Sequence, residues 1–225
     1  MKLEKYIDHT LLKADATLDA IEKLCKEAAE YRFASVCINP TYVTKANELL
    51  KDSDVKVCTV IGFPLGANVT DVKIYEAKNA LAEGATELDY VLNISDVKNG
   101  EFDRVQTEMA AFVGLKDDHP GLVIKVILET CYLTDLEIEK VCEIAKNTKI
   151  DFVKTSTGFG SGGATEEAVA LMKAAAGSEV EVKASGGVRT KGDAEKYIQL
   201  GATRIGTSNG VGIISLTDQT SGSGY

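Results

Sequence analysis

Four charged residues interrupt apolar stretches of this sequence. Lys125, Lys154 and Lys183 each have β-branched or other apolar neighbours, and Asp89 lies between Leu88 and Tyr90. A lone buried ammonium or carboxylate is costly, so each group must be paired, have a shifted pKa or serve a function. One such lysine would be interpreted as a strand-edge residue that reaches solvent. Three of them favour a shared cavity with a coupled charge network.

Two lysines close together in a cavity indicate nucleophilic chemistry. If one amine stays protonated, its charge disfavours protonation of the other, and the neutral amine can attack a carbonyl to form a Schiff base. The iminium is an electron sink that lets a C–C bond break or form, while a carboxylate such as Asp89 can hold a water and transfer protons. The pattern predicts a metal-free aldolase. Metal-assisted aldol chemistry is the alternative, but His9 and His119 are the only histidines and no HxH or HExxH motif is present.

Short apolar segments alternate with amphipathic segments along the whole chain. The apolar segments do not alternate in polarity, which is typical of strands that are covered on both faces. We predict strands over 34–38, 55–61, 87–92, 122–128, 151–155, 180–184 and 204–206, and a weaker one over 6–10. We predict helices over 17–32, 41–50, 70–83, 101–115, 134–147, 165–176 and 190–200. Strand–helix repetition of this kind predicts a parallel α/β sheet.

Eight such strands would close into a (β/α)₈ TIM barrel, a fold of about 250 residues. We predict a single catalytic domain over 1–214 with a short N-terminal extension, followed by a flexible polar tail over 215–225. An open doubly wound sheet is the alternative, but no GxGxxG motif follows the first strand. Active sites of TIM barrels lie at the C-terminal ends of the strands, where we expect the three lysines and Asp89 to meet.

The composition excludes several classes of protein. Acidic residues number 34 and basic residues 25, which gives a formal net charge of −9 and argues against nucleic acids and anionic membranes as partners. No apolar run is long enough to span a bilayer, and the charged N-terminus does not resemble a secretory signal. The five scattered cysteines indicate reduced thiols in a cytoplasmic protein.

Three glycine-rich segments follow consecutive predicted strands. They span 158–163, 185–189 and 206–210. Glycines let backbone N–H groups approach an anion, and barrels often bind phosphate with the loops after their last strands. Each segment alone is a weak signal because glycine-rich turns mostly serve geometry, but together they favour a phosphate site.

Several motifs of the chain resemble those of the bacterial deoxyribose-phosphate aldolase family over nearly the full length. The matching stretches are IDHTLLK at 7–13, SVCINPT at 35–41, GFPLG at 62–66, FVKTSTG at 152–158 and KASGGVR at 183–189. The resemblance implies a TIM barrel and a Schiff-base aldolase that needs no metal or cofactor. The implied reaction is reversible cleavage of 2-deoxy-D-ribose 5-phosphate to D-glyceraldehyde 3-phosphate and acetaldehyde, in deoxyribonucleoside catabolism.

The resemblance also implies roles for individual residues. Lys154 would form the Schiff base, Lys183 would lower its pKa and join a proton relay, Asp89 would activate a water, and Lys125 would support this network. The residues that would bind the substrate phosphate are Gly158, Gly186, Gly187, Ser208 and Asn209. Barrels of this kind often pair through their outer helices, so a homodimer is the assembly that we consider.

Four positions need separate comment. Asn209 stands where many members have a second serine, and Phe159 stands where some have a lysine, so phosphate binding would depend more on backbone N–H groups. Cys37 matches a pocket cysteine that reactive aldehydes can trap, although a buried strand residue is an equal interpretation. Tyr225 resembles a tail tyrosine that assists proton transfer in some relatives, and the alternative is a disordered chain end.

Two other functions remain open from the sequence. A non-catalytic barrel that binds sugar phosphates would keep the glycine-rich loops and leave the lysine pair idle. A phosphosugar isomerase or synthase on the same scaffold would have to use Asp89 as its base.

Overall fold

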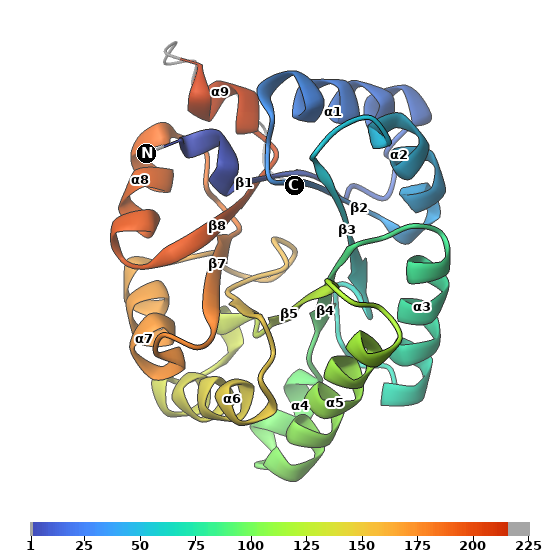
Figure 1. Ribbon diagram of the computed structural model, residues 1–225. Coiled ribbons are helices and arrows are strands. Elements are labelled where there is room, and N and C mark those ends of the chain that lie inside the picture. Colours follow the sequence, from blue (N-terminus) through green and yellow to red (C-terminus); the bar gives the residue numbers. More distant parts are fainter. Residues whose placement is uncertain (1, 216–225) are drawn as a thin grey trace.

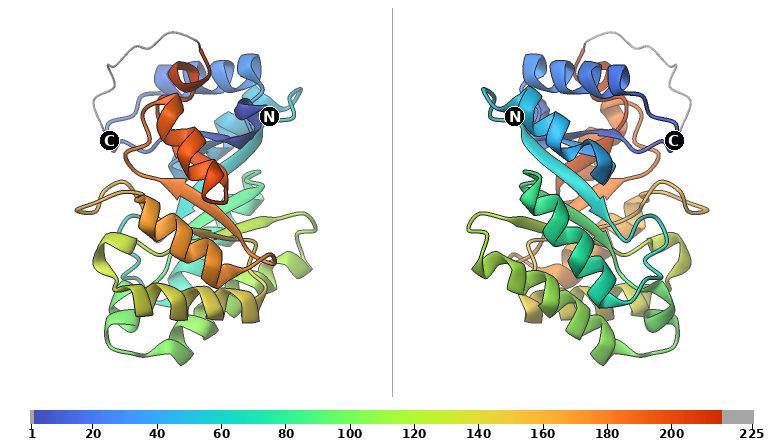
Figure 2. Two further views of the ribbon diagram at one scale, coloured as in Figure 1. Left: turned by 90° about the vertical axis from the view of Figure 1, so that its left-hand side faces the viewer. Right: turned by 90° about the vertical axis from the view of Figure 1, so that its right-hand side faces the viewer.

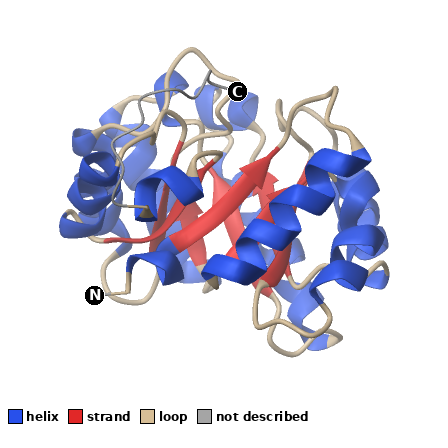
Figure 3. Cartoon of the chain, turned by 90° about the horizontal axis from the view of Figure 1, so that it is seen from above, coloured by secondary structure: helices blue, strands red, loops and turns tan. Residues whose placement is uncertain are grey.

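Eight parallel strands form a closed barrel at the centre of the molecule (Figures 1 and 3). The structure is a computed structural model that describes residues 2–215. The strands are β1 (Ile7–Leu11), β2 (Ser35–Ile38), β3 (Lys56–Ile61), β4 (Glu87–Val91), β5 (Val123–Ile127), β6 (Phe152–Lys154), β7 (Glu181–Ser185) and β8 (Ala202–Thr207). Each strand pairs with the next in the sequence, and β8 closes the barrel on β1, where Asp8 lies opposite Gly206. The predicted TIM barrel is thereby confirmed, and the open-sheet alternative is wrong.

Helices cover the outside of this barrel (Figure 2). They are α1 (Leu18–Tyr31), α2 (Val43–Leu50), α3 (Thr70–Ala82), α4 (Ile94–Lys98), α5 (Phe102–Gly114), α6 (Asp135–Thr148), α7 (Glu166–Ala176), α8 (Lys191–Gln199) and α9 (Gly210–Ile214). Short 3₁₀ turns add η1 (Leu3–Tyr6), η2 (Pro40–Tyr42), η3 (Leu115–Asp117) and η4 (Thr130–Tyr132). Within 2–215, none of the helices is both long and apolar enough to cross a membrane.

Threonine caps explain where many of these helices begin. The Thr134 side chain accepts from the Glu137 amide while the Glu137 side chain accepts from the Thr134 amide, so two backbone donors at the start of α6 are satisfied. Thr190 forms a second capping box with Asp193 at α8, and the side chains of Thr17 and Thr165 each accept from one amide at the start of α1 and α7. These start signals are local, and the sequence places the starts of the helices within a residue or two.

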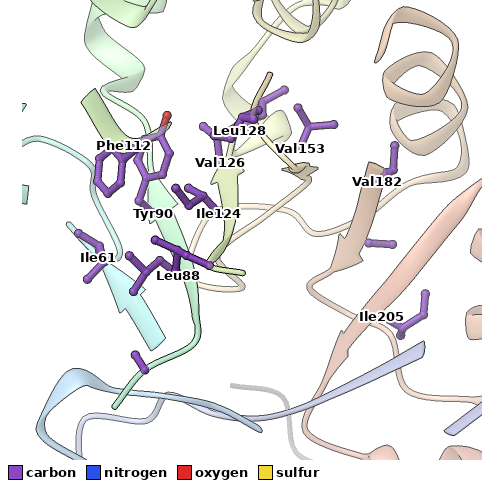
Figure 4. Packing of buried hydrophobic residues seen from close by; sticks show 14 of the residues in the cluster. Ile61, Leu88, Tyr90, Phe112, Ile124, Val126, Leu128, Val153, Val182 and Ile205 are labelled. Carbon is purple, nitrogen blue, oxygen red and sulfur yellow. The ribbon is translucent and has the colours of Figure 1, made fainter. Parts of the chain in front are cut away.

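Apolar side chains fill the layer between the strands and the helices. Figure 4 shows part of this layer, with residues of β3 to β8 packed against outer side chains such as Phe112. The Tyr90 and Phe112 rings stack with centroids 3.7 Å apart, which joins β4 to α5. The inside of the barrel differs, because a small apolar cluster of Leu12, Cys37, Cys58 and Val60 and the Phe152 ring lie there beside buried charged groups.

Short elements and the chain end depart from the sequence predictions. The helices α4 and α9 have five residues each and give too short a pattern to detect. β1 is a full five-residue strand although its sequence is weakly patterned, since Asp8 joins the charged interior while His9 contacts Glu27 of α1 on the outside. Of the predicted tail over 215–225, only residue 215 lies among the described residues, so that domain boundary stays a prediction.

Candidate active site

Asp89 lies at the centre of the barrel and contacts all three lysines that the sequence singled out. Its Oδ2 accepts from Lys154 Nζ at 2.8 Å and from Lys183 Nζ at 2.6 Å. Its Oδ1 accepts from Lys125 Nζ at 2.9 Å. Asp89, Lys125 and Lys183 are fully buried, and Lys154 is 2% exposed. The predicted shared charge network therefore exists, and the strand-edge interpretation of these lysines is wrong.

The depth of these groups differs from the expectation that all lie at strand ends. Lys154 is the last residue of β6, whereas Asp89, Lys125 and Lys183 occupy the middle of their strands. Lys154 is also the direct neighbour of Lys183 across the β6–β7 pair. Adjacent strands are about 4.8 Å apart, so two like charges would face each other if Asp89 did not lie between their amines.

A second set of ion pairs lies deeper in the barrel. Lys125 Nζ also contacts Glu87 Oε2 at 2.5 Å, and Arg204 donates to both oxygens of Glu87, at 3.2 and 2.8 Å. Arg204 Nε donates to Asp8 Oδ1 at 2.7 Å, and Lys183 Nζ lies 2.6 Å from Asp8 Oδ2. Through Asp8, this second set of ion pairs also includes Lys183.

These contacts form a closed ring of alternating charge, which we call the charge ring. Its members, in order of contact, are Asp89, Lys125, Glu87, Arg204, Asp8 and Lys183. The ring contains three carboxylates and three cations and is formally neutral. Lys154 lies outside it and shares one oxygen of Asp89 with Lys183.

Three members of the charge ring were not found from the sequence: Asp8, Glu87 and Arg204. Glu87 stands two residues before Asp89 on β4, and this spacing places both side chains on the same face. The two-residue spacing from Asp89 was therefore a sequence signal that could have identified Glu87. Asp8 lies on the weakly patterned β1, and Arg204 lies on β8, of which the sequence prediction covered only 204–206, so neither prediction showed which residues point inward.

Electrostatics fix the charge of the ring. Burial alone would raise the pKa of Asp89, but Lys125, Lys154 and Lys183 outweigh it and hold that pKa well below its usual range. Arg204 and Lys183 likewise outweigh burial and lower the pKa of Asp8. Burial opposes the charge of Lys183, yet Asp8 and Asp89 raise its pKa well above the ordinary value. Lys183 therefore stays an ammonium beside Lys154.

Two cysteines lie beside Asp89 on the β2 and β3 side. Cys58 Sγ donates to Asp89 Oδ1 at 3.1 Å, and Cys37 Sγ lies 4.0 Å from Asp89 Oδ2. Among the described residues, Cys37, Cys58 and Asp89 are the one group of three metal-ligating side chains whose ligand atoms converge, within 4.8 Å of one another. The donor set suits a thiophilic cation. The surrounding ammonium groups oppose a further positive charge, with Lys125 Nζ 3.5 Å from Cys58 Sγ, so these residues do not fit a resident metal ion.

The three glycine-rich loops lie side by side after β6, β7 and β8. The Ala164 amide donates to the Gly186 carbonyl at 3.0 Å, and Thr207 Oγ1 donates to the Val188 carbonyl at 2.8 Å. A Cβ on Gly163 would lie 2.2 Å from the carbonyl oxygen of Gly186, so this close approach requires glycine. The predicted phosphate residues are thereby brought to one edge of the barrel.

The individual loop residues differ in what they can still offer to an anion. Gly158, Gly186 and Gly187 have φ between +80° and +87°, and nothing lies within 4 Å of the position of a Cβ on Gly187. Ser208 is exposed. Asn209 Nδ2 donates to the Arg189 carbonyl at 2.9 Å, so this amide also holds two loops together. The Asn209 substitution is therefore accommodated by the local structure.

Phe159 occupies the rim above these loops. Its ring packs edge to face on Phe63, with centroids 5.3 Å apart, and its side chain is 44% exposed. Its amide donates to Thr157 Oγ1 at 3.0 Å. An aromatic pair thus covers the rim position where the sequence comparison pointed to a lysine.

Glu129 anchors the segment that follows Lys154, and no sequence pattern had singled it out. It lies after β5 with φ +56°, accepts from the Thr157 amide at 3.2 Å, and accepts a second bond from the Thr157 hydroxyl. A Cβ on Gly160 would lie 3.0 Å from the Glu129 side chain. Glu129 therefore fixes the course of the loop between the amine and the predicted phosphate site.

Two other candidates lie elsewhere. His9 is buried and its Nε2 lies 2.8 Å from Glu27 Oε2, which agrees with a structural role. Tyr225 lies outside the described residues, so its role stays a prediction.

Comparisons with known proteins show that the chain is similar to aldolases over nearly its full length. The profile of the family described as DeoC/LacD family aldolase matches residues 2–219. The chain is 58% identical to the deoxyribose-phosphate aldolase of Caldanaerobacter subterraneus subsp. tengcongensis, over 95% of this chain and 93% of that protein. It is 58% identical to that of Staphylococcus carnosus, over 95% of this chain and 96% of that protein. A solved deoxyribose phosphate aldolase from Aeropyrum pernix, described as tetrameric, superposes with a TM-score of 0.87 at 37% identity and covers 94% of this chain and 88% of that one.

Proposed function

The chain belongs to the DeoC/LacD family of aldolases, and we propose that its site cleaves 2-deoxy-D-ribose 5-phosphate reversibly into D-glyceraldehyde 3-phosphate and acetaldehyde. The enzyme is a class I aldolase, a lyase that acts through a Schiff base in the catabolism of deoxyribonucleosides. The single observation that carries the site assignment is the charge ring, because it leaves one lysine, Lys154, as an additional amine.

Lys154 is the proposed nucleophile. The ring is neutral with three carboxylates and three cations, so a protonated Lys154 would add an unmatched positive charge to a buried cluster. This balance favours Lys154 as the amine that gives up its proton to attack a carbonyl. Its position at the end of β6, where a TIM barrel binds substrates, supports the same role.

The reaction then follows from the Schiff base. The Lys154 amine adds to the C1 aldehyde of the open-chain sugar, and loss of water gives an iminium. Removal of the proton from the C3 hydroxyl breaks the C2–C3 bond, releases D-glyceraldehyde 3-phosphate and leaves an enamine on Lys154. Protonation of the enamine at C2 and hydrolysis of the new iminium release acetaldehyde and regenerate the amine.

Asp89 and Lys183 are the proposed proton-transfer pair beside this amine. Asp89 Oδ2 contacts both amines, and its lowered pKa keeps it ionised, so it can accept hydrogen bonds from a water and orient that water for proton transfer. Lys183 stays charged and favours the neutral form of its neighbour. Lys125 holds the other oxygen of Asp89 and fixes the orientation of that carboxylate.

The glycine-rich loops are the proposed phosphate site. The residues assigned to it are Gly158, Gly186, Gly187, Ser208 and Asn209. The hydrogen bonds that join the three loops keep their backbone in place before any ligand binds. Since Phe159 adds no charge at the rim, backbone N–H groups and hydroxyls supply the recognition.

The purified protein tests this function directly. We expect 2-deoxy-D-ribose 5-phosphate to disappear while equal amounts of D-glyceraldehyde 3-phosphate and acetaldehyde form, and the reverse condensation to occur with the two aldehydes. Thermal stabilisation by the sugar phosphate without any product would contradict the proposal and indicate a non-catalytic binding barrel. Isomerised sugar phosphate as the product would contradict it as well.

The place of action and the assembly belong to the same proposal. All five cysteines are free, which supports a reducing compartment, the cytoplasm. Exposed apolar side chains on the β3–α3 segment, Leu65, Val69, Val72 and Tyr75, support pairing of two copies. A homodimer should have twice the chain mass in light scattering, and a monomeric mass over the working range of concentration would contradict it.

A further inference from the structure

Cys37 and Cys58 are direct neighbours in the wall of the active site. They are paired across β2 and β3 in register, and both side chains belong to the small apolar cluster inside the barrel. Parallel strands are about 4.8 Å apart, which lies within the Cα separation of about 4.4–6.8 Å that a disulfide requires. The two sulfur atoms lie within 4.8 Å of each other. A modest rotation of the side chains would therefore bring them into bonding distance.

The two thiols differ in their chemistry. A hydrogen bond with Cys58 lowers the pKa of the Cys37 thiol against the effect of burial, and the Lys183 ammonium acts in the same direction. Burial and the hydrogen bond with Cys37 raise the pKa of the Cys58 thiol well above its usual value. Cys37 thus has the character of an attacking thiolate and Cys58 that of a resolving thiol.

The remaining buried cysteines lack this combination. Cys25 lies on α1 and Cys142 on α6, and burial raises their pKa values to about 11 and about 12. Their thiols are therefore held protonated and unreactive. Cys131, which is partly exposed after β5, serves as the natural control for a cysteine near the same barrel edge.

We propose that hydrogen peroxide converts Cys37 and Cys58 into a reversible intramolecular disulfide, and that this disulfide suppresses catalysis. The second part rests on the aldolase function proposed above. Asp89 is the link, because its two oxygens contact the two sulfur atoms at 4.0 and 3.1 Å. When the sulfurs bond to each other they lose their protons, so the carboxylate that contacts Lys154 through Oδ2 loses the Cys58 donor on its Oδ1.

The oxidation balances with peroxide as the oxidant. The Cys37 thiolate attacks one peroxide oxygen, so that an S–O bond forms, the O–O bond breaks and hydroxide leaves to become water. Cys58 sulfur then attacks the sulfenic sulfur of Cys37, the S–S bond forms, and the hydroxyl leaves as water with the Cys58 proton. Two thiols and one peroxide give one disulfide and two waters. Peroxide is smaller than the aldehydes that must reach Lys154.

Mass spectrometry tests the disulfide independently of activity. The protein is treated with hydrogen peroxide, free thiols are alkylated, and trypsin releases the peptides 33–45 and 57–73, which contain Cys37 and Cys58. We expect these peptides to appear cross-linked, and dithiothreitol to separate them. Oxidation that gives only sulfinic acid at Cys37, or a cross-link that involves another cysteine, would overturn the proposal.

Activity measured on the same samples tests the inhibition. Loss of one hydrogen bond to a charged group predicts a fall in activity of about tenfold, in proportion to the cross-link and recovered with dithiothreitol. A full cross-link with unchanged activity would overturn the inhibitory part. An untreated protein without aldolase activity would contradict the proposed function instead, while the cross-link would still be measurable.

Single substitutions separate the roles of the cysteines. Each peroxide-treated variant is compared with its own untreated activity. In Cys58→Ala, peroxide should cause a loss of activity that dithiothreitol no longer reverses, because Cys37 has no resolving partner. Cys131→Ser should behave like the unchanged protein. Reversible inhibition that persists in Cys58→Ala and disappears in Cys131→Ser would overturn the assignment. Circular dichroism checks that each variant is folded.

Discussion

The barrel contains two buried lysine–carboxylate systems whose electrostatics are opposite. In the charge ring, Lys183 contacts two carboxylates and its pKa is raised despite burial. Between α3 and α5, Lys73 Nζ contacts one carboxylate, Glu108 Oε2, at 2.8 Å, and also donates to the Val91 carbonyl. There burial dominates, so the pKa of Lys73 is lowered and that of Glu108 is raised.

The difference follows the number of carboxylates in direct contact with each buried amine. Two carboxylates around Lys183 outweigh the cost of removing its charge from water, and one carboxylate beside Lys73 does not. Lys154 has one carboxylate contact, which it shares with a permanently charged neighbour. In the proposed function, the same fold therefore holds structural ammonium groups and one amine that reacts.

Replacing Lys183 should have the largest effect. In Lys183→Met the three carboxylates of the ring keep two cations, so Lys154 becomes the third and stays protonated. We expect kcat/KM to fall about 10²–10⁴-fold at neutral pH and to recover partly in alkaline solution, as for loss of a proton-transfer group. A pH–rate profile measures both effects.

An exposed lysine provides the control for this substitution. Lys191 lies on the surface of α8, and Lys191→Met should leave the pH–rate profile unchanged. A Lys183→Met enzyme whose rate falls equally at every pH would show that Lys183 acts only as scaffolding.

A substitution in the charge ring at a residue that does not contact Lys154 should lower the free energy of unfolding more than it lowers activity. Glu87→Gln removes one of the two carboxylates that contact Lys125 and one of the two that contact Arg204. Removal of one partner from a buried ion pair costs about 3–5 kcal/mol, and we expect about 3 kcal/mol here because both cations keep a second partner. Chemical denaturation measures the free energy of unfolding.

The exposed pair of Lys140 and Glu143 gives the matched control. Glu143→Gln should leave the free energy of unfolding essentially unchanged, because exposed pairs contribute little. Equal losses in Glu87→Gln and Glu143→Gln would mean that the ring adds nothing beyond a surface contact.

Substitution of the buried Lys73–Glu108 pair should change the free energy of unfolding much less than Glu87→Gln does. The double variant Lys73→Met with Glu108→Leu removes two buried charges, and we expect a free energy of unfolding within about 2 kcal/mol of the unchanged protein. Because the pKa of Glu108 is raised by folding, its contribution is favourable below the unfolded value and is lost as pH rises through the folded value. The free energy of unfolding of the variant, relative to that of the unchanged protein, should therefore be higher at pH 7 than at about pH 4.5.

The backbone amide of Asn93 donates to Glu108 Oε1 at 3.2 Å, and it loses this acceptor in the double variant. The lost hydrogen bond limits how stable the variant can be. Denaturation curves at both pH values measure the difference. A stability loss as large as that of Glu87→Gln, independent of pH, would remove the distinction between the two systems.

The sequence predicted the barrel and the buried lysines because both leave local signals. Continuous apolar strands alternate with capped helices such as α6, and Lys154 and Lys183 are charged residues within such strands. Asp8 and Arg204 escaped notice because β1 is weakly patterned and only part of β8 was predicted, so the sequence did not reveal which of their residues point inward. Lys73 occupies an ordinary polar position of α3, and it is buried only because α3 packs on α5 and β4, contacts that no local pattern encodes.

Trapping of the Schiff base tests the central claim most directly. The protein is incubated with acetaldehyde, reduced with borohydride and digested, and the peptides are weighed. We expect one ethyl group on Lys154 and none on Lys73, Lys125 or Lys183, and we expect the adduct to disappear in Lys154→Leu. An unmodified Lys154, or an ethyl group on a lysine of the charge ring instead, would contradict the account.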